Sequence, residues 1–145
     1  MKPLALTVLC LLLALCAGCG AGPEPGPAPA EEFDLTVVNE LETADIWLLP
    51  QTEQNLHTTV WGAATLADLG SGGEGRLSLT ALGGPGVYIL RVIDENGMYY
   101  AADGLTLEAG CALRLTDEEG PDAAALTVTD AAGEAASYPL FAARL

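Results

Sequence analysis

Few residues of this chain are of the types that nucleophilic catalysis requires. The only histidine, His57, lies in the polar stretch 51–59, and a nucleophile must be activated by a base within hydrogen-bonding reach. The serines are Ser71, Ser78 and Ser137, and none lies in a Gly-x-Ser-x-Gly elbow. We therefore predict no catalytic triad, and we expect that the chain is not an enzyme.

Carboxylates offer a second kind of chemistry, because two facing acids in a cleft can hydrolyse a glycosidic bond when they lie roughly 5 to 9 Å apart. The chain has twenty acidic residues, so their presence alone does not discriminate, and a carboxylate-dependent hydrolase remains an alternative. Aromatic rings suit non-covalent contact, either with a sugar or peptide or within the domain's own core. The candidate aromatics are Trp47, Trp61, Tyr99, Tyr100 and Tyr138.

Metal sites are limited by the ligands present. There is no Cys-x-x-Cys motif and no histidine pair, so zinc and haem are not expected. Two acidic turns hold hard oxygen ligands of the kind that calcium prefers. Neither turn matches the Asp-x-Asp-x-Asp-Gly loop with its distal Glu, so we expect no cofactor, with calcium as the alternative. The calcium candidates are Asp94 and Asn96 in one turn, and Asp117, Glu119 and Asp122 in the other.

The chain begins with the features of an export signal. Met1-Lys2 precedes an uncharged apolar run, 4–17, and small residues precede Cys19. Fourteen helical residues span about 21 Å, less than the roughly 30 Å hydrocarbon core of a bilayer. The run therefore suits a helical signal peptide better than a transmembrane helix.

The Ala17-Gly18-Cys19 sequence resembles the lipobox of bacterial lipoproteins, in which the cysteine is acylated and becomes the mature N-terminus. The position three residues before the cysteine holds Cys16 here, where family members usually have Leu. The resemblance implies lipidation of Cys19, palmitate among the acyl groups, and an anchor on the extracytoplasmic face of a bacterial cell membrane. Plain secretion with cleavage nearby is the alternative.

A proline-rich segment follows the predicted anchor. Four prolines fall between Pro23 and Pro29, and such a stretch favours extended polyproline geometry and cannot pack a core. We predict a signal peptide at 1–18, a lipid-anchored Pro/Gly-rich linker at 19–32 and one domain at 33–145.

The charge of the exported part limits its partners. Residues 19–145 hold four arginines, no lysine and all twenty acidic residues, so their formal charge is −16. Such a field repels phosphate backbones, and nucleic acid is not expected as a partner. Only Cys111 remains after the signal and Cys19. Its leucine-rich neighbourhood predicts a buried, inert thiol.

Short apolar runs separated by turn residues predict β-strands. Several alternate with period two, as Leu113 and Leu115 do around Arg114, which indicates one buried and one solvated face. Residues 87–93 are apolar on both faces except for Arg91 and predict a central strand. Asp94-Glu95-Asn96-Gly97 predicts a hairpin turn. Residues 59–69 leave room for one helical turn. The predicted strands are 33–38, 45–50, 75–82, 87–94, 98–101, 105–108, 112–116, 125–129 and 135–141.

These elements predict an all-β fold, a single antiparallel β-sandwich of about seven to nine short strands. The order Asp45-Ile46-Trp47, Trp61-Gly62, Leu69-Gly70 and 88–94 is similar to that of a small β-sandwich module of secreted and lipid-anchored bacterial proteins. The resemblance covers about residues 33–116 and implies a fold rather than a chemistry.

The function expected from these features is that of an acidic, surface-anchored bacterial lipoprotein of structural or interaction type. Its partners would be the membrane, through the N-terminal lipid, and an envelope protein or glycan. The alternatives are a calcium- or carbohydrate-binding β-sandwich module and the carboxylate-dependent hydrolase. The residues predicted to contact a ligand are Trp47, Trp61, Tyr99 and Tyr100.

Overall fold

The computed structural model describes residues 32–118 and 123–145. The predicted signal peptide, Cys19 and all of the predicted linker except Glu32 lie outside the described residues, as do the calcium candidates Glu119 and Asp122. Among the helices that are described, none has the length and hydropathy needed to cross a membrane.

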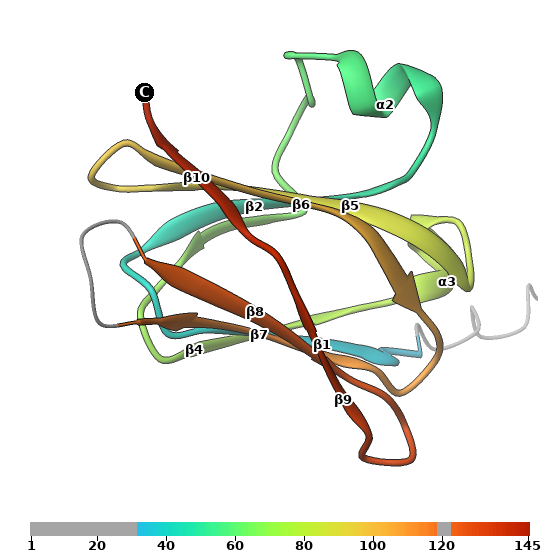
Figure 1. The fold of residues 1–145 in the computed structure, drawn as a ribbon. Coiled ribbons are helices and arrows are strands. Elements are labelled where there is room, and N and C mark those ends of the chain that lie inside the picture. The colour runs from blue at the N-terminus through green and yellow to red at the C-terminus, as the bar shows by residue number, and fades with distance from the viewer. Residues whose placement is uncertain (1–31, 119–122) are drawn as a thin grey trace, which may run out of the picture. The chain divides into compact units, whose positions relative to one another are not determined.

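The described residues form two five-stranded sheets (Figure 1). The first sheet has the order β4-β1-β7-β8-β9, and its pairs are antiparallel except for β1 with β7, which are parallel. Buried and half-buried residues alternate along β1, as expected for a strand with one face on the core. The strands are β1 (Leu35–Asn39), β4 (Gly73–Leu77), β7 (Ala112–Asp117), β8 (Ala124–Thr129) and β9 (Ala135–Tyr138).

The second sheet has the order β10-β6-β5-β2-β3, and all its pairs are antiparallel. Its centre is the hairpin of β5 and β6. Gly97 has φ 77° and donates its N–H to the carbonyl of Asp94 at 3.0 Å, which confirms the predicted hairpin turn. The strands are β2 (Ala44–Pro50), β3 (Leu66–Leu69), β5 (Gly86–Asp94), β6 (Met98–Leu107) and β10 (Phe141–Arg144).

One apolar core lies between the sheets. Both sheets contribute fully buried residues to it. They are Val37 and Leu113 from the first sheet, and Ile46, Leu90 and Leu105 from the second. The result is a two-layered, β-sandwich-like arrangement, and the predicted all-β class is confirmed.

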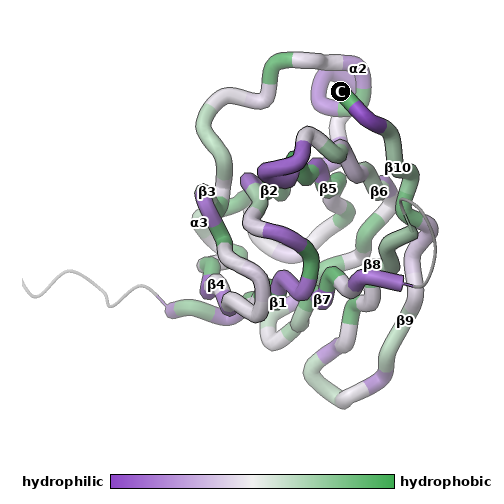
Figure 2. Tube along the Cα trace, turned by 90° about the vertical axis from the view of Figure 1, so that its left-hand side faces the viewer, coloured by the Kyte–Doolittle hydropathy of each residue, from purple (hydrophilic) through white to green (hydrophobic). Residues whose placement is uncertain are grey.

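A third, partial layer covers the outer face of the second sheet. Residues 51–65, here called the covering loop, contain the short helix α2 (Glu53–His57). Figures 1 and 2 show α2 on the side of β2, β5 and β6 that faces away from β1 and β7. Under this loop Ile89 of β5 is fully buried although it does not belong to the core cluster. The strand predicted to be apolar on both faces is thus covered on both.

Several details differ from the sequence prediction. The predicted strands 98–101 and 105–108 form the single strand β6, and the predicted strand 135–141 is divided between β9 and β10, which lie in different sheets. The strands number ten among the described residues, and β1 pairs in parallel with β7. Residues 59–69 hold no helical turn; instead, α2 precedes them and β3 ends them. The predicted strand 75–82 ends as β4 and continues as the helix α3 (Leu79–Leu82), because the Ser78 hydroxyl caps the N–H of Ala81.

Candidate functional site

A cavity of about 650 Å³ lies between the covering loop and the outer face of the second sheet. We call it the aromatic cavity. Its walls come from α2 and the residues after it, and its floor comes from β5 and β6. The volume falls within the range of small-molecule sites, roughly 300 to 1,000 Å³. The lining residues are Leu56, His57, Thr58, Thr59, Trp61, Arg91, Ile93, Tyr99 and Leu145.

Two of the predicted ligand-contact aromatics, Trp61 and Tyr99, line this cavity, and a third, Trp47, packs beside Trp61. The rings of Trp61 and Tyr99 are stacked, with centroids 5.8 Å apart and planes 7° apart. Trp47 also contacts Trp61: their ring centroids lie 5.6 Å apart and their planes are tilted by 56°. All three side chains are half-buried, and neither tryptophan belongs to the core between the sheets. The tryptophans therefore serve the outer face.

The indole N–H of Trp47 ties the covering loop to β2, and the indole N–H of Trp61 forms a hydrogen bond within the loop. Trp47 donates to the carbonyl of Gly62 and Trp61 donates to the carbonyl of Thr58, each at 3.1 Å. Thr65 adds a hydroxyl that accepts the backbone N–H of Leu48 at 3.0 Å. The loop is thus fastened to the sheet at its second half, which fixes the wall of the aromatic cavity.

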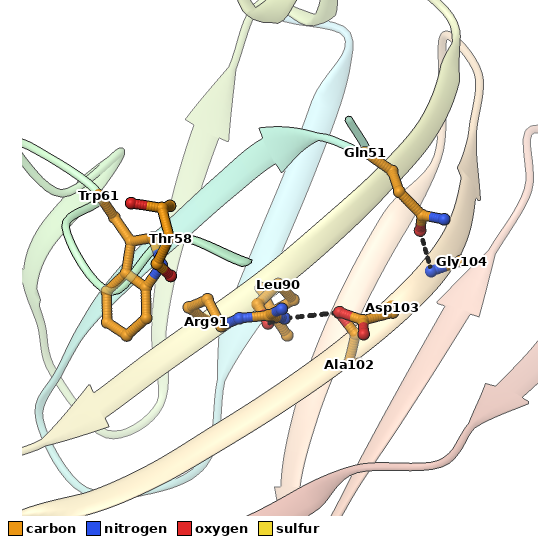
Figure 3. Close-up of polar contacts among 8 residues, drawn as sticks. All are labelled: Gln51, Thr58, Trp61, Leu90, Arg91, Ala102, Asp103 and Gly104. Carbon is orange, nitrogen blue, oxygen red and sulfur yellow. Dashed lines mark hydrogen bonds and ion pairs between the residues drawn. The ribbon is translucent and has the colours of Figure 1, made fainter. Parts of the chain in front are cut away.

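Arg91 forms the polar part of the cavity floor. Its side chain is only 7% exposed and pairs with Asp103 of β6 across 2.7 Å (Figure 3). The same Nη1 atom also donates to the carbonyls of Leu90 at 2.8 Å and Ala102 at 3.3 Å. A buried cation requires such partners. The nearby amide of Gln51 accepts the N–H of Gly104 at 2.7 Å and ties the start of the covering loop to β6.

Tyr100 differs from the other predicted aromatics. Adjacent residues of a strand point to opposite faces, so Tyr99 lines the aromatic cavity while Tyr100 is 7% exposed and belongs to the core cluster. Tyr100 also borders a separate polar cavity at one end of the sheets. It is therefore not part of the aromatic cavity.

His57 borders the aromatic cavity from α2. Its imidazole is 79% exposed and lies 3.6 Å from the carboxylate of Glu53, one helical turn away. Its position suits contact with a ligand at the cavity mouth.

The described calcium candidates meet at a second cavity, of about 580 Å³, here called the end cavity. Asp94, Asn96 and Asp117 line it together with Glu40 and other residues. Asp94 Oδ1 already accepts two N–H groups of its own hairpin, and Glu40 pairs with Arg114. Within residues 32–118 and 123–145, no group of three His, Cys, Asp or Glu side chains is placed to hold a metal ion.

Cys111 is 4% exposed and lies in the core cluster, as predicted. Its sulfur accepts the N–H of Glu108 at 3.4 Å. The thiol is thus enclosed by the fold, away from the aromatic cavity.

Sequence reasoning did not select Arg91, Thr58 or Leu56 for the site. Arg91 could have been noticed, since it is the one charged residue in the apolar run 87–93. Nothing in the sequence singles out Thr58 or Leu56, because only the fold shows which side of the sheet the loop covers. A comparison of the chain with protein-family models, curated proteins and solved structures finds no match.

Proposed function

We propose that this chain is a lipid-anchored bacterial protein of the extracytoplasmic face, that it acts by contact rather than catalysis, and that the aromatic cavity is its contact site. The observation that carries the proposal is the convergence of Trp61, Tyr99 and Arg91 around one cavity of ligand size. The domain that presents it is a single β-sandwich.

The anchor rests on the Ala17-Gly18-Cys19 sequence after a short apolar run. Two or more acyl chains hold a protein firmly to a bilayer, since each buried methylene contributes about 0.8 kcal/mol. We expect Cys19→Ala to leave an unprocessed precursor or to release the protein from the membrane. Mass spectrometry of the N-terminal peptide and membrane fractionation measure this, and an unmodified Cys19 in membrane-bound protein would contradict the anchor.

The contact function rests on the lining of the aromatic cavity. Half-buried rings contribute large apolar contact areas, and a guanidinium adds directed hydrogen bonds. The formal charge of −15 disfavours nucleic acid and anionic surfaces. The partner classes that we propose are an envelope protein and an envelope glycan.

The test is capture of cross-linked partners from intact envelopes with the wild-type chain and with Tyr99→Leu. Phe33→Leu is the matched control, because Phe33 is 57% exposed and does not line the aromatic cavity. We expect Tyr99→Leu to lose a partner or glycan that wild type and Phe33→Leu both retain. Identical capture by all three proteins would contradict the assignment of the cavity.

A further inference from the structure

The floor of the aromatic cavity holds a buried cation with unused donors. A guanidinium carries five N–H groups, and the three hydrogen bonds of Arg91 all leave from Nη1. No buried side-chain nitrogen or oxygen of residues 32–118 and 123–145 lacks a partner. The Nε and Nη2 groups of Arg91 therefore reach solvent, and Arg91 is a lining residue of the aromatic cavity.

The charge of this floor is already balanced. Asp103 Oδ1 lies 2.7 Å from Arg91 Nη1, and the whole chain has a formal charge of −15. An anion approaching the cavity meets a repulsive field and a cation that is already paired. A neutral ligand meets neither obstacle, and its oxygens can accept from the remaining N–H groups. The floor thus favours neutral, oxygen-bearing groups.

The wall beside Arg91 is flat and apolar. Tyr99 pairs across the strands with Ile93, and both line the cavity. The Tyr99 ring is stacked on Trp61, which holds it in a fixed orientation. Leu56 and Leu145 add apolar surface around the cavity. A ligand that fits this wall has a flat apolar face.

A pyranose ring combines these properties, since it has a face of C–H groups and an edge of hydroxyl or acetamido oxygens. We propose that the aromatic cavity binds a short neutral saccharide, one ring lying against Tyr99 and Ile93 while its edge oxygens accept N–H groups from Arg91 Nε and Nη2. This inference rests on the proposed contact function and names its ligand class.

The test is isothermal titration calorimetry with the full-length protein. The protein is held in a detergent without a sugar headgroup, because a glycosidic detergent would itself offer the ligand. The probes are chitotriose and cellotriose, which share a β-1,4-linked backbone and differ in the acetamido group. A proline-rich peptide is the third probe, since aromatic grooves also bind such peptides. We expect saturable binding of at least one trisaccharide at one site per chain.

Two variants test the two halves of the cavity. Tyr99→Leu removes the aromatic wall, and we expect affinity to fall about tenfold. Arg91→Lys keeps a cation for Asp103 but removes the planar fork, and we expect a loss of about tenfold or more. Phe33→Leu should bind as wild type does. If Arg91→Lys fails to fold, Tyr99→Leu alone decides, because Tyr99 is only half-buried.

Absence of saccharide binding by the wild type would overturn the inference, and so would equal binding by wild type and Tyr99→Leu. Binding of the proline-rich peptide alone, weakened by Tyr99→Leu, would overturn the saccharide class and leave the contact function standing. If the wild type binds neither trisaccharide nor peptide, and Tyr99→Leu captures the same envelope partners as wild type, both proposals are overturned together.

Discussion

Replacing Asn39 should destabilise the domain more than any exposed polar substitution. Asn39 is the last residue of β1 and is fully buried. Its Nδ2 donates to the carbonyl of Leu69 at 2.8 Å and to that of Glu42 at 2.9 Å, and its Oδ1 accepts the N–H of Leu41 at 3.1 Å. Because Leu69 belongs to β3, this one amide links a strand of each sheet.

The expected effect of Asn39→Ala follows from these three bonds. Each contributes about 1 kcal/mol, and the buried groups left behind find no new partner, so we expect a loss of about 3 kcal/mol. For a domain of this size that corresponds to a fall in Tm of roughly 12 °C. Urea unfolding followed by tryptophan fluorescence measures the change. Gln54→Ala, on the exposed face of α2, is the control and should change stability by less than about 0.5 kcal/mol.

Asn39→Asp separates the donor from the acceptor. It keeps an oxygen for Leu41 but turns a second oxygen toward the carbonyls of Leu69 and Glu42. This arrangement disfavours the carboxylate, so the folded pKa of the introduced group should exceed its unfolded value. A raised folded pKa means that stability is retained at low pH and lost as pH rises. The penalty of Asn39→Asp should therefore be larger at pH 8 than at pH 5, whereas that of Asn39→Ala should not change. An Asn39→Asp protein as stable as wild type at pH 8 would refute this account.

Three further predictions concern single contacts and use urea unfolding as the measurement. Burial raises the pKa of the Tyr88 hydroxyl, which donates to the Gly84 carbonyl at 2.6 Å. The hydroxyl therefore stabilises the fold below about pH 10, and this stabilisation is lost at higher pH. Tyr88→Phe should cost about 1 kcal/mol at pH 7, and the variant should lose less stability than wild type between pH 7 and pH 11. Equal losses by the two proteins over that range would contradict this role. A Cβ on Gly75 would lie 2.6 Å from Leu66 Cδ1, the end of a side chain that can shift, so Gly75→Ala should cost about 1 kcal/mol. Leu66→Ala in the same chain should remove most of that added penalty, and strictly additive effects would exclude the clash. Asp94→Ala should cost about 2 kcal/mol because it removes the acceptor of two turn N–H groups. Asp94→Asn keeps an acceptor oxygen and should cost less than half as much; equal losses would contradict this role.

Local patterns were sufficient where a structural element depends only on its own residues. Period-two alternation predicted β7 and β8, an apolar run bounded by turn residues predicted β1, and the Asn-Gly pair predicted the hairpin between β5 and β6. The same patterns carry no information on which strands become neighbours. The parallel pairing of β1 with β7 joins segments more than seventy residues apart in the sequence, and nothing within either segment specifies it.

The sequence prediction missed β3 and extended a strand over α3, and each error has a local cause. β3 has two exposed central residues and a register shift against β2, so its alternation is too weak to recognise. The helix α3 begins where Ser78 caps it and ends at Gly83, which has φ 126°. Leucine alternation alone cannot distinguish such a turn from the end of a strand.

The candidate site was predictable in part. Trp47, Trp61 and Tyr99 were selected by residue type, and the structure brings them together. The separation of Tyr99 from Tyr100 follows from strand geometry, since neighbours along a strand face opposite ways. The calcium candidates Asp94 and Asp117 also converge, at the end cavity, but a shared cavity is not a coordination shell. A coordination shell requires short distances between the ligand atoms, and the local sequence does not specify those distances.

The aromatic cavity follows from the composition of β5. A strand that is apolar on both faces must be covered on both, and the first sheet covers only one. The covering loop supplies the second cover, yet it is largely polar and its helix α2 buries no residue. It therefore seals the sheet where Trp47 and Trp61 fasten it and leaves a space elsewhere. That space lies over Arg91, the one position where β5 places a charge among apolar residues. Because Nε and Nη2 of Arg91 reach solvent, a ligand that accepts hydrogen bonds from them would take the place of water as their partner.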